Sequence, residues 1–135
     1  MNIKALPMTL FLLASAGLAQ AGTAEDDARL HIRAIAENDL PALLGQYAPY
    51  AHLSWKGGPL QGSYDGTDSI EKVWQKFVEG QGPLSANIEE LVEKASVDES
   101  TVSARVLYKG QKELRVIQTM TYRKGQLADE VWAVK

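Results

Sequence analysis

Apolar and polar residues alternate along the last third of the chain, and this pattern predicts three neighbouring strands. The apolar positions of the first two runs are Val102, Ala104, Val106 and Tyr108, then Leu114, Val116, Met120 and Tyr122. A third run covers residues 127–134. A period of two is typical of a strand that is buried on one face. Short turns such as Lys124-Gly125-Gln126 separate the runs, so we expect an antiparallel meander.

One polar residue, Gln118, lies on the apolar face of the middle strand. A buried amide needs hydrogen-bond partners or a wet cavity, so this position is a candidate for lining a pocket. An apolar residue would suit the same face, and Gln118→Leu is therefore expected to leave folding intact or to improve it.

The last strand can be oriented in two ways. One phase buries Glu130 together with Ala128, Trp132 and Val134, and the other buries Asp129 together with Leu127, Val131 and Ala133. Both sets of positions are largely apolar, so the alternation alone allows either face to be the covered one.

Apolar residues three and four positions apart in the first half predict helices that cover the sheet. Residues 24–38 form the first, with His31 bordering a stripe made by Ala28, Ile32 and Ile35. Residues 40–47 form a short second helix that ends at Pro49. A third helix begins at Thr67 or Asp68, stops at Gly80 to Pro83, and carries Ile70, Val73, Trp74, Phe77 and Val78.

The remaining segments complete an α+β fold. Residues 52–56 form a short strand with Leu53 and Trp55 on one face, and residues 62–66 form a glycine-rich loop. Residues 84–97 form a strand whose alternation is poor. We expect a cone-shaped, curved antiparallel sheet wrapped by three N-terminal helices, because the apolar face of the meander must be covered.

Residues 1–21 have the pattern of a secretory signal peptide. Lys4 provides the positive charge, residues 5–18 form an uncharged apolar run, and Ala19-Gln20-Ala21 forms a small-residue cleavage site. The apolar run is shorter than the roughly 20 residues that a membrane-spanning helix needs. We therefore predict an exported protein, periplasmic or secreted, with no stable membrane insertion after cleavage and a single domain over residues 22–135.

Composition excludes several classes of function. The formal net charge is −3, which gives no support for nucleic-acid binding. The chain has no cysteine, so it uses neither disulfides nor thiolate chemistry. Its two histidines and scattered carboxylates show no metal-ligand spacing, and we expect neither a metal site nor a cofactor.

Three segments resemble the nuclear transport factor 2-like superfamily, in particular its SnoaL-like and ketosteroid-isomerase-like branches. They are residues 34–55 (AIAENDLPALLGQYAPYAHLSW), 58–77 (GPLQGSYDGTDSIEKVWQKF) and 122–132 (YRKGQLADEVW). The resemblance implies a cone-shaped α+β fold with a deep pocket between helices and sheet, often in a homodimer.

The resemblance also implies positions for site residues. A catalytic tyrosine of the steroid isomerases falls on His31, their aspartate base on Trp55, and their protonated aspartic acid on Gln118. An indole cannot accept the proton, so we do not expect ketosteroid isomerase activity. For the last strand, the resemblance favours the phase that places Glu130 on the covered face of the sheet. Burial there would raise the pKa of its carboxyl and suit it to act as a base.

These observations give three hypotheses. The first is a pocket protein that binds a small apolar or aromatic molecule, with a pocket lined by His31, Trp55, Gln118, Met120, Glu130 and Trp132. The second is a lyase, isomerase or hydrolase that uses Glu130 or His31 as its base. The third is an interaction domain, in which the opposite face of the sheet pairs with its copy through Arg105, Arg115, Thr119 and Thr121.

Overall fold

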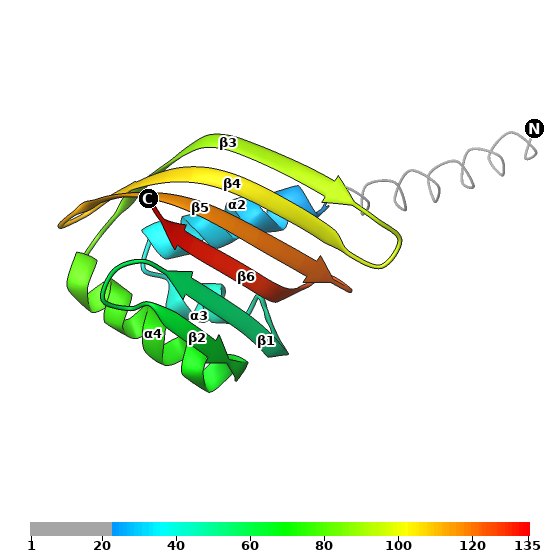
Figure 1. The fold of residues 1–135 in the computed structure, drawn as a ribbon, viewed down its shortest axis with the longest axis horizontal. Helices are drawn as coiled ribbons and strands as arrows, with labels where there is room; N and C mark the ends of the chain where they lie inside the picture. The colour runs from blue at the N-terminus through cyan, green and yellow to red at the C-terminus, as the bar shows by residue number, and fades with distance from the viewer. Residues whose placement is uncertain (1–22) are drawn as a thin grey trace, which may run out of the picture.

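The computed structural model describes residues 23–135, an α+β fold with a curved six-stranded sheet and helices on one side of it (Figure 1). The helices are α2 (Thr23–Ala36), α3 (Leu40–Leu44) and α4 (Gly66–Gln81). The strands are β1 (Tyr47–Lys56), β2 (Gly62–Asp65), β3 (Ser85–Ala95), β4 (Ser100–Lys109), β5 (Glu113–Arg123) and β6 (Gln126–Val134). The predicted signal peptide and its cleavage site lie outside the described residues.

The helices are unequal, and the second, which the sequence predicted to be short, is shorter still. α2 and α4 have 14 and 16 residues, whereas α3 is a single turn of five. α2 packs on β3 and β4, α4 packs on β1 and β2, and α3 contacts both long helices. Within residues 23–135, no helix is at once long enough and apolar enough to cross a membrane.

The sheet is mixed, which corrects the prediction of an entirely antiparallel one. Its strand order is β2-β1-β6-β5-β4-β3, and the pair of β1 and β6 is parallel while the other neighbours are antiparallel. Parallel neighbours need a long connection, and here α4 and the whole meander lie between them. The parallel pairing sets Leu53 beside Glu130 and Trp55 beside Trp132.

The sequence interpretation was wrong between residues 45 and 66. The second helix ends at Leu44, Tyr47 already belongs to β1, and the predicted loop at 62–66 is mostly strand β2. The register of β1 against β6 shifts between Tyr47 and His52. This irregularity accommodates Pro49, which cannot donate a ladder hydrogen bond, and it breaks the alternation by which a strand is recognised.

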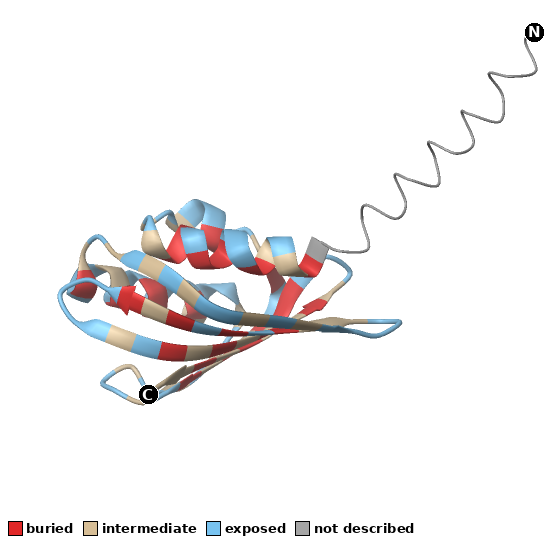
Figure 2. Cartoon of the chain, turned by 90° about the horizontal axis from the view of Figure 1, so that it is seen from above, coloured by how far each residue is buried: buried red, intermediate tan, exposed pale blue. Residues whose placement is uncertain are grey.

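The core lies between the helices and the covered face of the sheet, where the buried residues gather (Figure 2). Most of the predicted stripes of α2 and α4 and of the apolar faces of β4 and β5 is buried as expected, while Val78 and Leu114 are half-buried. In β6 both Leu127 and Ala128 are buried, and Glu130 and Trp132 also point inward. A register shift against β5 between Thr121 and Tyr122 lies opposite this end of β6, where residues of both phases are buried.

Candidate functional site

A closed cluster of polar side chains, centred on Glu130, lies between the helices and the sheet. Glu130 comes from β6, His31 from α2 and Gln118 from β5, and their exposed fractions are 1%, 0% and 0%. The inward phase of β6 and the alternation of β5 place the two strand residues on the covered face. His31 reaches them because it lies beside the buried apolar stripe of α2. Three polar groups that are far apart in the sequence therefore meet inside the core.

Each oxygen of the Glu130 carboxylate accepts hydrogen bonds. The Tyr47 hydroxyl donates to Oε1. His31 Nε2 lies 2.9 Å from Oε2, and Gln118 Nε2 donates to the same oxygen at 3.1 Å. Three donors from three different elements therefore hold one buried carboxylate, which is the arrangement that a buried charge requires.

Further partners extend this cluster in both directions. Gln46 Oε1 lies 2.8 Å from His31 Nδ1, and the Trp74 indole donates to the Tyr47 hydroxyl at 2.9 Å. The Tyr108 hydroxyl donates to Gln118 Oε1. A side-chain amide can present either its oxygen or its NH₂ group, so Gln46 can satisfy the imidazole in more than one tautomer.

The hydrogen bonds reverse the expected effect of burial on Glu130. Burial raises the pKa of this carboxyl, but the charge of His31 and the hydrogen bonds from His31, Tyr47 and Gln118 outweigh it, so the pKa is lowered. The prediction of a raised pKa is wrong, because the sequence did not show how many donors surround the group. For Tyr47 and Tyr108, burial and the charge of Glu130 raise the pKa of the phenol, which keeps both as donors.

An aromatic cluster made by Trp55, Trp74, Phe77, Tyr108 and Trp132 lies beside the polar residues. Trp132 is at its centre, with its ring centroid 4.9 Å from that of Trp55 and 5.1 Å from that of Tyr108. The interplanar angles are 34° and 30°, and Phe77 and Trp74 meet Trp132 edge-on. The Trp132 indole nitrogen is buried and has no hydrogen-bond partner among residues 23–135.

A pocket of about 460 Å³ opens on the other side of this aromatic cluster. Trp55 and Phe77 form its inner wall, and its volume lies in the usual range for small-molecule sites. The remaining lining comes from the loop after β1, the end of α4, the β4–β5 turn and the ends of β5 and β6: Gly57, Gly58, Pro59, Leu60, Lys76, Gly80, Gln81, Gln111, Lys112, Leu114 and Val134.

The structure divides the six predicted pocket residues into two groups. Trp55 lines the pocket. The other five, which are His31, Gln118, Met120, Glu130 and Trp132, are buried behind it. Met120 faces Glu130 across the β5–β6 pair, and Gln118 faces Trp132. Whether the buried residues meet a ligand remains a prediction, but they form one continuous set of contacts that reaches the pocket wall.

Sequence reasoning missed four members of the polar cluster and its surroundings: Gln46, Tyr47, Trp74 and Tyr108. Tyr47 was assigned to the end of a helix, and Trp74 and Tyr108 were read as apolar core. One signal was present for Tyr108, because a buried phenol and the buried amide of Gln118 on the same covered face both need partners. Among the described residues, no group of three or more histidines and carboxylates is arranged to hold a metal ion.

Comparison with known proteins agrees with this fold. Residues 28–130 match the SnoaL-like domain family, and the protein belongs to this family. A nuclear transport factor 2-like protein of unknown function from Pseudomonas putida is 17% identical, with a TM-score of 0.73 over 86% of this chain and 87% of that chain. No curated protein matches the sequence.

Two further solved structures carry functional descriptions. A candidate dehydratase of the nuclear transport factor 2-like family from Streptomyces avermitilis is 10% identical, with a TM-score of 0.70 over 87% of this chain and 97% of that chain. A ketosteroid isomerase-like protein from Erwinia carotovora atroseptica is 19% identical, with a TM-score of 0.64 over 82% and 92%. Identities this low establish the shared fold alone.

The lowered pKa of Glu130 predicts acid-sensitive stability. The carboxyl has an ordinary pKa of 4.5, and its folded-state pKa lies lower. The contribution of the ionised Glu130 carboxylate to the free energy of unfolding is therefore fully present above about pH 4.5. It is lost as the pH falls through the folded-state pKa. We expect urea titrations to show a free energy of unfolding that decreases below this pH.

Glu130→Gln provides the comparison, because it removes the titrating group. Subtracting the two pH profiles also cancels the contribution of Asp27, whose pKa is raised by burial and which acts in the opposite direction. If the free energy of unfolding of the wild type and of Glu130→Gln depended on pH in the same way, the lowered pKa of Glu130 would be contradicted.

Proposed function

We propose that this protein binds a small apolar or aromatic molecule without transforming it. The observation that carries the proposal is the pocket of about 460 Å³, whose inner wall is Trp55 and Phe77 and whose sides include Leu60, Leu114 and Val134. A pocket of this volume with aromatic and aliphatic walls favours planar or hydrophobic ligands. In this proposal the sheet and helices form an open cone with the pocket at its mouth.

The polar cluster supports the proposal because it fixes the elements that carry the aromatic residues of the pocket. Its hydrogen bonds hold α2, β1, β5 and β6 together, so the wall that faces the ligand is supported from behind. A pocket that is formed before the ligand arrives costs less ordering on binding.

Calorimetric titration with neutral bicyclic aromatics, led by 2-naphthamide, tests the proposal. We expect saturable binding that Leu114→Ser weakens by about tenfold, or roughly 1.4 kcal/mol, because the variant removes apolar wall. Leu30→Ser is the matched control, since Leu30 is a leucine on α2 with 48% exposure and does not line the pocket. Absence of binding, or equal weakening by both variants, would contradict the proposal.

The alternative function is that of a lyase, isomerase or hydrolase. The pairing of His31 Nε2 with Glu130 Oε2 at 2.9 Å favours it, since a base needs an oriented partner. The lowered pKa weakens Glu130 as a base, and the buried pair would need the aromatic cluster to open. Because Trp55 occupies the position of the isomerase base, we expect no isomerisation of a β,γ-unsaturated ketone. Turnover that is lost in Glu130→Gln would favour the enzyme instead.

A homodimer through the open face of the sheet is the second part of the proposal. The face is mixed in polarity, with Thr119 and Thr121 half-buried and Arg115 held by both oxygens of Glu89 at 2.7 and 2.8 Å. We expect light scattering at micromolar concentration to give twice the chain mass. Thr119→Lys should give the single mass, because like charges meet across a two-fold axis. A monomer at every concentration of the wild type would contradict this.

Export is the third part, and it rests on the sequence of residues 1–21. We expect protein isolated from the host envelope to begin at Gly22, as N-terminal sequencing would show. Ala21→Glu should block processing, because the cleavage site requires small residues. Wild-type protein that retains Lys4 in the envelope would contradict the prediction.

A further inference from the structure

The pocket differs from the rest of the molecule in its charge. Within residues 23–135 its lining includes two lysines, Lys76 and Lys112, and no carboxylate. The whole chain has 17 acidic and 14 basic residues. A positive site on a negative protein concentrates attraction for an anion at one place.

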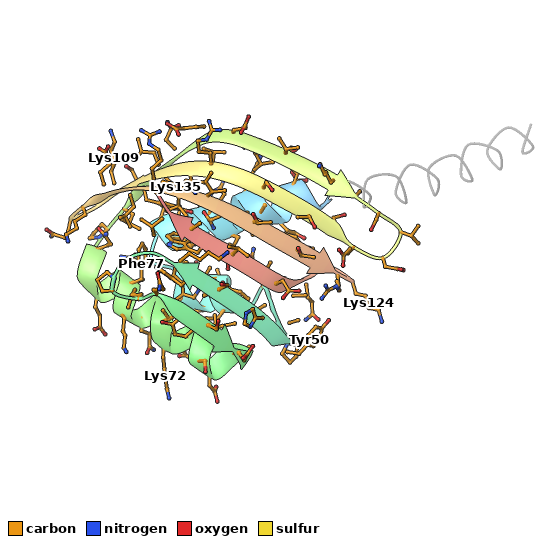
Figure 3. The ribbon with its side chains drawn as sticks, viewed as in Figure 1. Tyr50, Lys72, Phe77, Lys109, Lys124 and Lys135 are labelled. Atoms are coloured by element: carbon orange, nitrogen blue, oxygen red, sulfur yellow. The ribbon has the colours of Figure 1, made fainter. Side chains whose placement is uncertain are left out.

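The two lysines are available to a ligand. Every ion pair found within residues 23–135 uses arginine or histidine as its cation, and neither Lys76 nor Lys112 takes part. Lys76 comes from α4 beside Phe77, and Lys112 comes from the β4–β5 turn. Figure 3 places Phe77 at the end of the molecule that also carries Lys109 and Lys135, and it shows Lys72 pointing away from the sheet.

The turn that carries Lys112 is fixed against the end of α4. Gln81 Oε1 accepts a hydrogen bond from the Lys112 backbone at 3.0 Å, and the Gln81 carbonyl accepts one from Gln111 at 3.1 Å. A side-chain carbon added at Gly110 would lie 2.4 Å from Leu84 Cδ2, so the fit is close. The backbone around Lys112 is therefore held in position before a ligand arrives.

The lining of the pocket also offers a neutral donor for an anion. With its oxygen occupied by the turn, the Gln81 side chain retains its NH₂ group as a donor in the pocket lining. At the end of α4, two of the last carbonyl groups accept hydrogen bonds, since Val78 accepts from Gly82 at 2.9 Å and Gln81 accepts from Gln111.

We propose that the ligand is an amphipathic anion, with an apolar or aromatic body against Trp55 and Phe77 and a carboxylate or sulfonate between Lys76 and Lys112. This inference rests on the proposed function, because it concerns the same pocket. The apolar wall provides affinity for the body of the ligand, and the lysines select the charged head group.

Two probes of the same size separate the head group from the body. 2-Naphthoate is an anion at neutral pH, whereas 2-naphthamide is neutral and nearly identical in shape. By calorimetric titration at low salt, we expect the wild type to bind naphthoate about tenfold more tightly than the amide. The preference should decrease as salt is added, because the head-group site is near the solvent.

Lysine variants assign the preference to the pocket. Lys76→Gln and Lys112→Gln should each reduce naphthoate affinity several-fold, and the double variant should bind the two probes equally. Amide binding should be unchanged in all of them. Lys72→Gln is the matched control, because it lies one turn before Lys76 on α4 and does not line the pocket. It removes the same charge and should keep the preference.

The outcomes distinguish the two proposals. If neither probe binds, the proposed function and this inference both fail. If both probes bind equally to the wild type, or if Lys72→Gln reduces the preference as much as the pocket variants do, the anionic ligand is overturned while the apolar pocket stands. Naphthoate preference that is lost only in the pocket variants supports the inference.

Discussion

Glu130→Leu is expected to lower the free energy of unfolding by about 3–5 kcal/mol, because each buried donor that loses its acceptor costs about 1–3 kcal/mol. The variant leaves three donors, from His31, Tyr47 and Gln118, without the carboxylate that accepts their hydrogen bonds. Their burial prevents water from replacing it without rearrangement of the core. Urea titration at neutral pH, followed by far-ultraviolet circular dichroism, measures the loss.

A matched change on the surface shows whether the effect belongs to the cluster. Glu113 is an exposed carboxylate at the start of β5. Glu113→Leu should change the free energy of unfolding by less than about 0.5 kcal/mol, as is usual for surface substitutions. If Glu130→Leu were as mild as the control, the cluster would contribute little to the stability of the fold.

Gln118→Leu should destabilise the protein, contrary to what the apolar face of β5 suggests. The amide accepts from Tyr108 and donates to Glu130, so leucine leaves the buried Tyr108 hydroxyl unpaired and removes one of the three donors to the carboxylate. An unpaired buried group costs about 1–3 kcal/mol. The same urea titrations measure the change, with Gln126→Leu, which alters an exposed glutamine at the start of β6, as a control that should be nearly neutral.

Tyr108→Phe provides a second check on this hydrogen bond. The phenylalanine removes the hydroxyl that Gln118→Leu leaves unpaired, so the double variant should lose less stability than the sum of the two single variants. Strict additivity would contradict a direct interaction between Tyr108 and Gln118.

The elements that sequence predicted best have an uninterrupted period. The stripe of α4 and the alternation of β4 and β5 each follow one face for their full length, and the structure confirms them. The start of β1 was missed because Pro49 and a register shift interrupt its pattern. β2 has only four residues, which is too short for periodicity to distinguish it from a glycine-containing loop.

The sequence predicted three members of the polar cluster but not their chemistry, and of the six predicted pocket residues only Trp55 lines the described pocket. The polar outlier on β5 and the family register correctly brought His31, Gln118 and Glu130 together. The direction of the Glu130 pKa depended on partners such as Tyr47, whose place in β1 the sequence did not show. The parallel neighbour of β6 depended on pairing between distant segments, which has no local signature.

The aromatic cluster gives this protein an unusual optical property. All three tryptophans of the chain belong to it, with ring centroids separated by 4.9, 5.2 and 5.3 Å. At these separations we expect the indoles to exchange excitation energy, so that their emission reports on the cluster as a whole. Since Trp55 also lines the pocket, a change in fluorescence reports movement of that wall and does not distinguish it from global unfolding. Only a backbone signal measured in parallel can separate the two events.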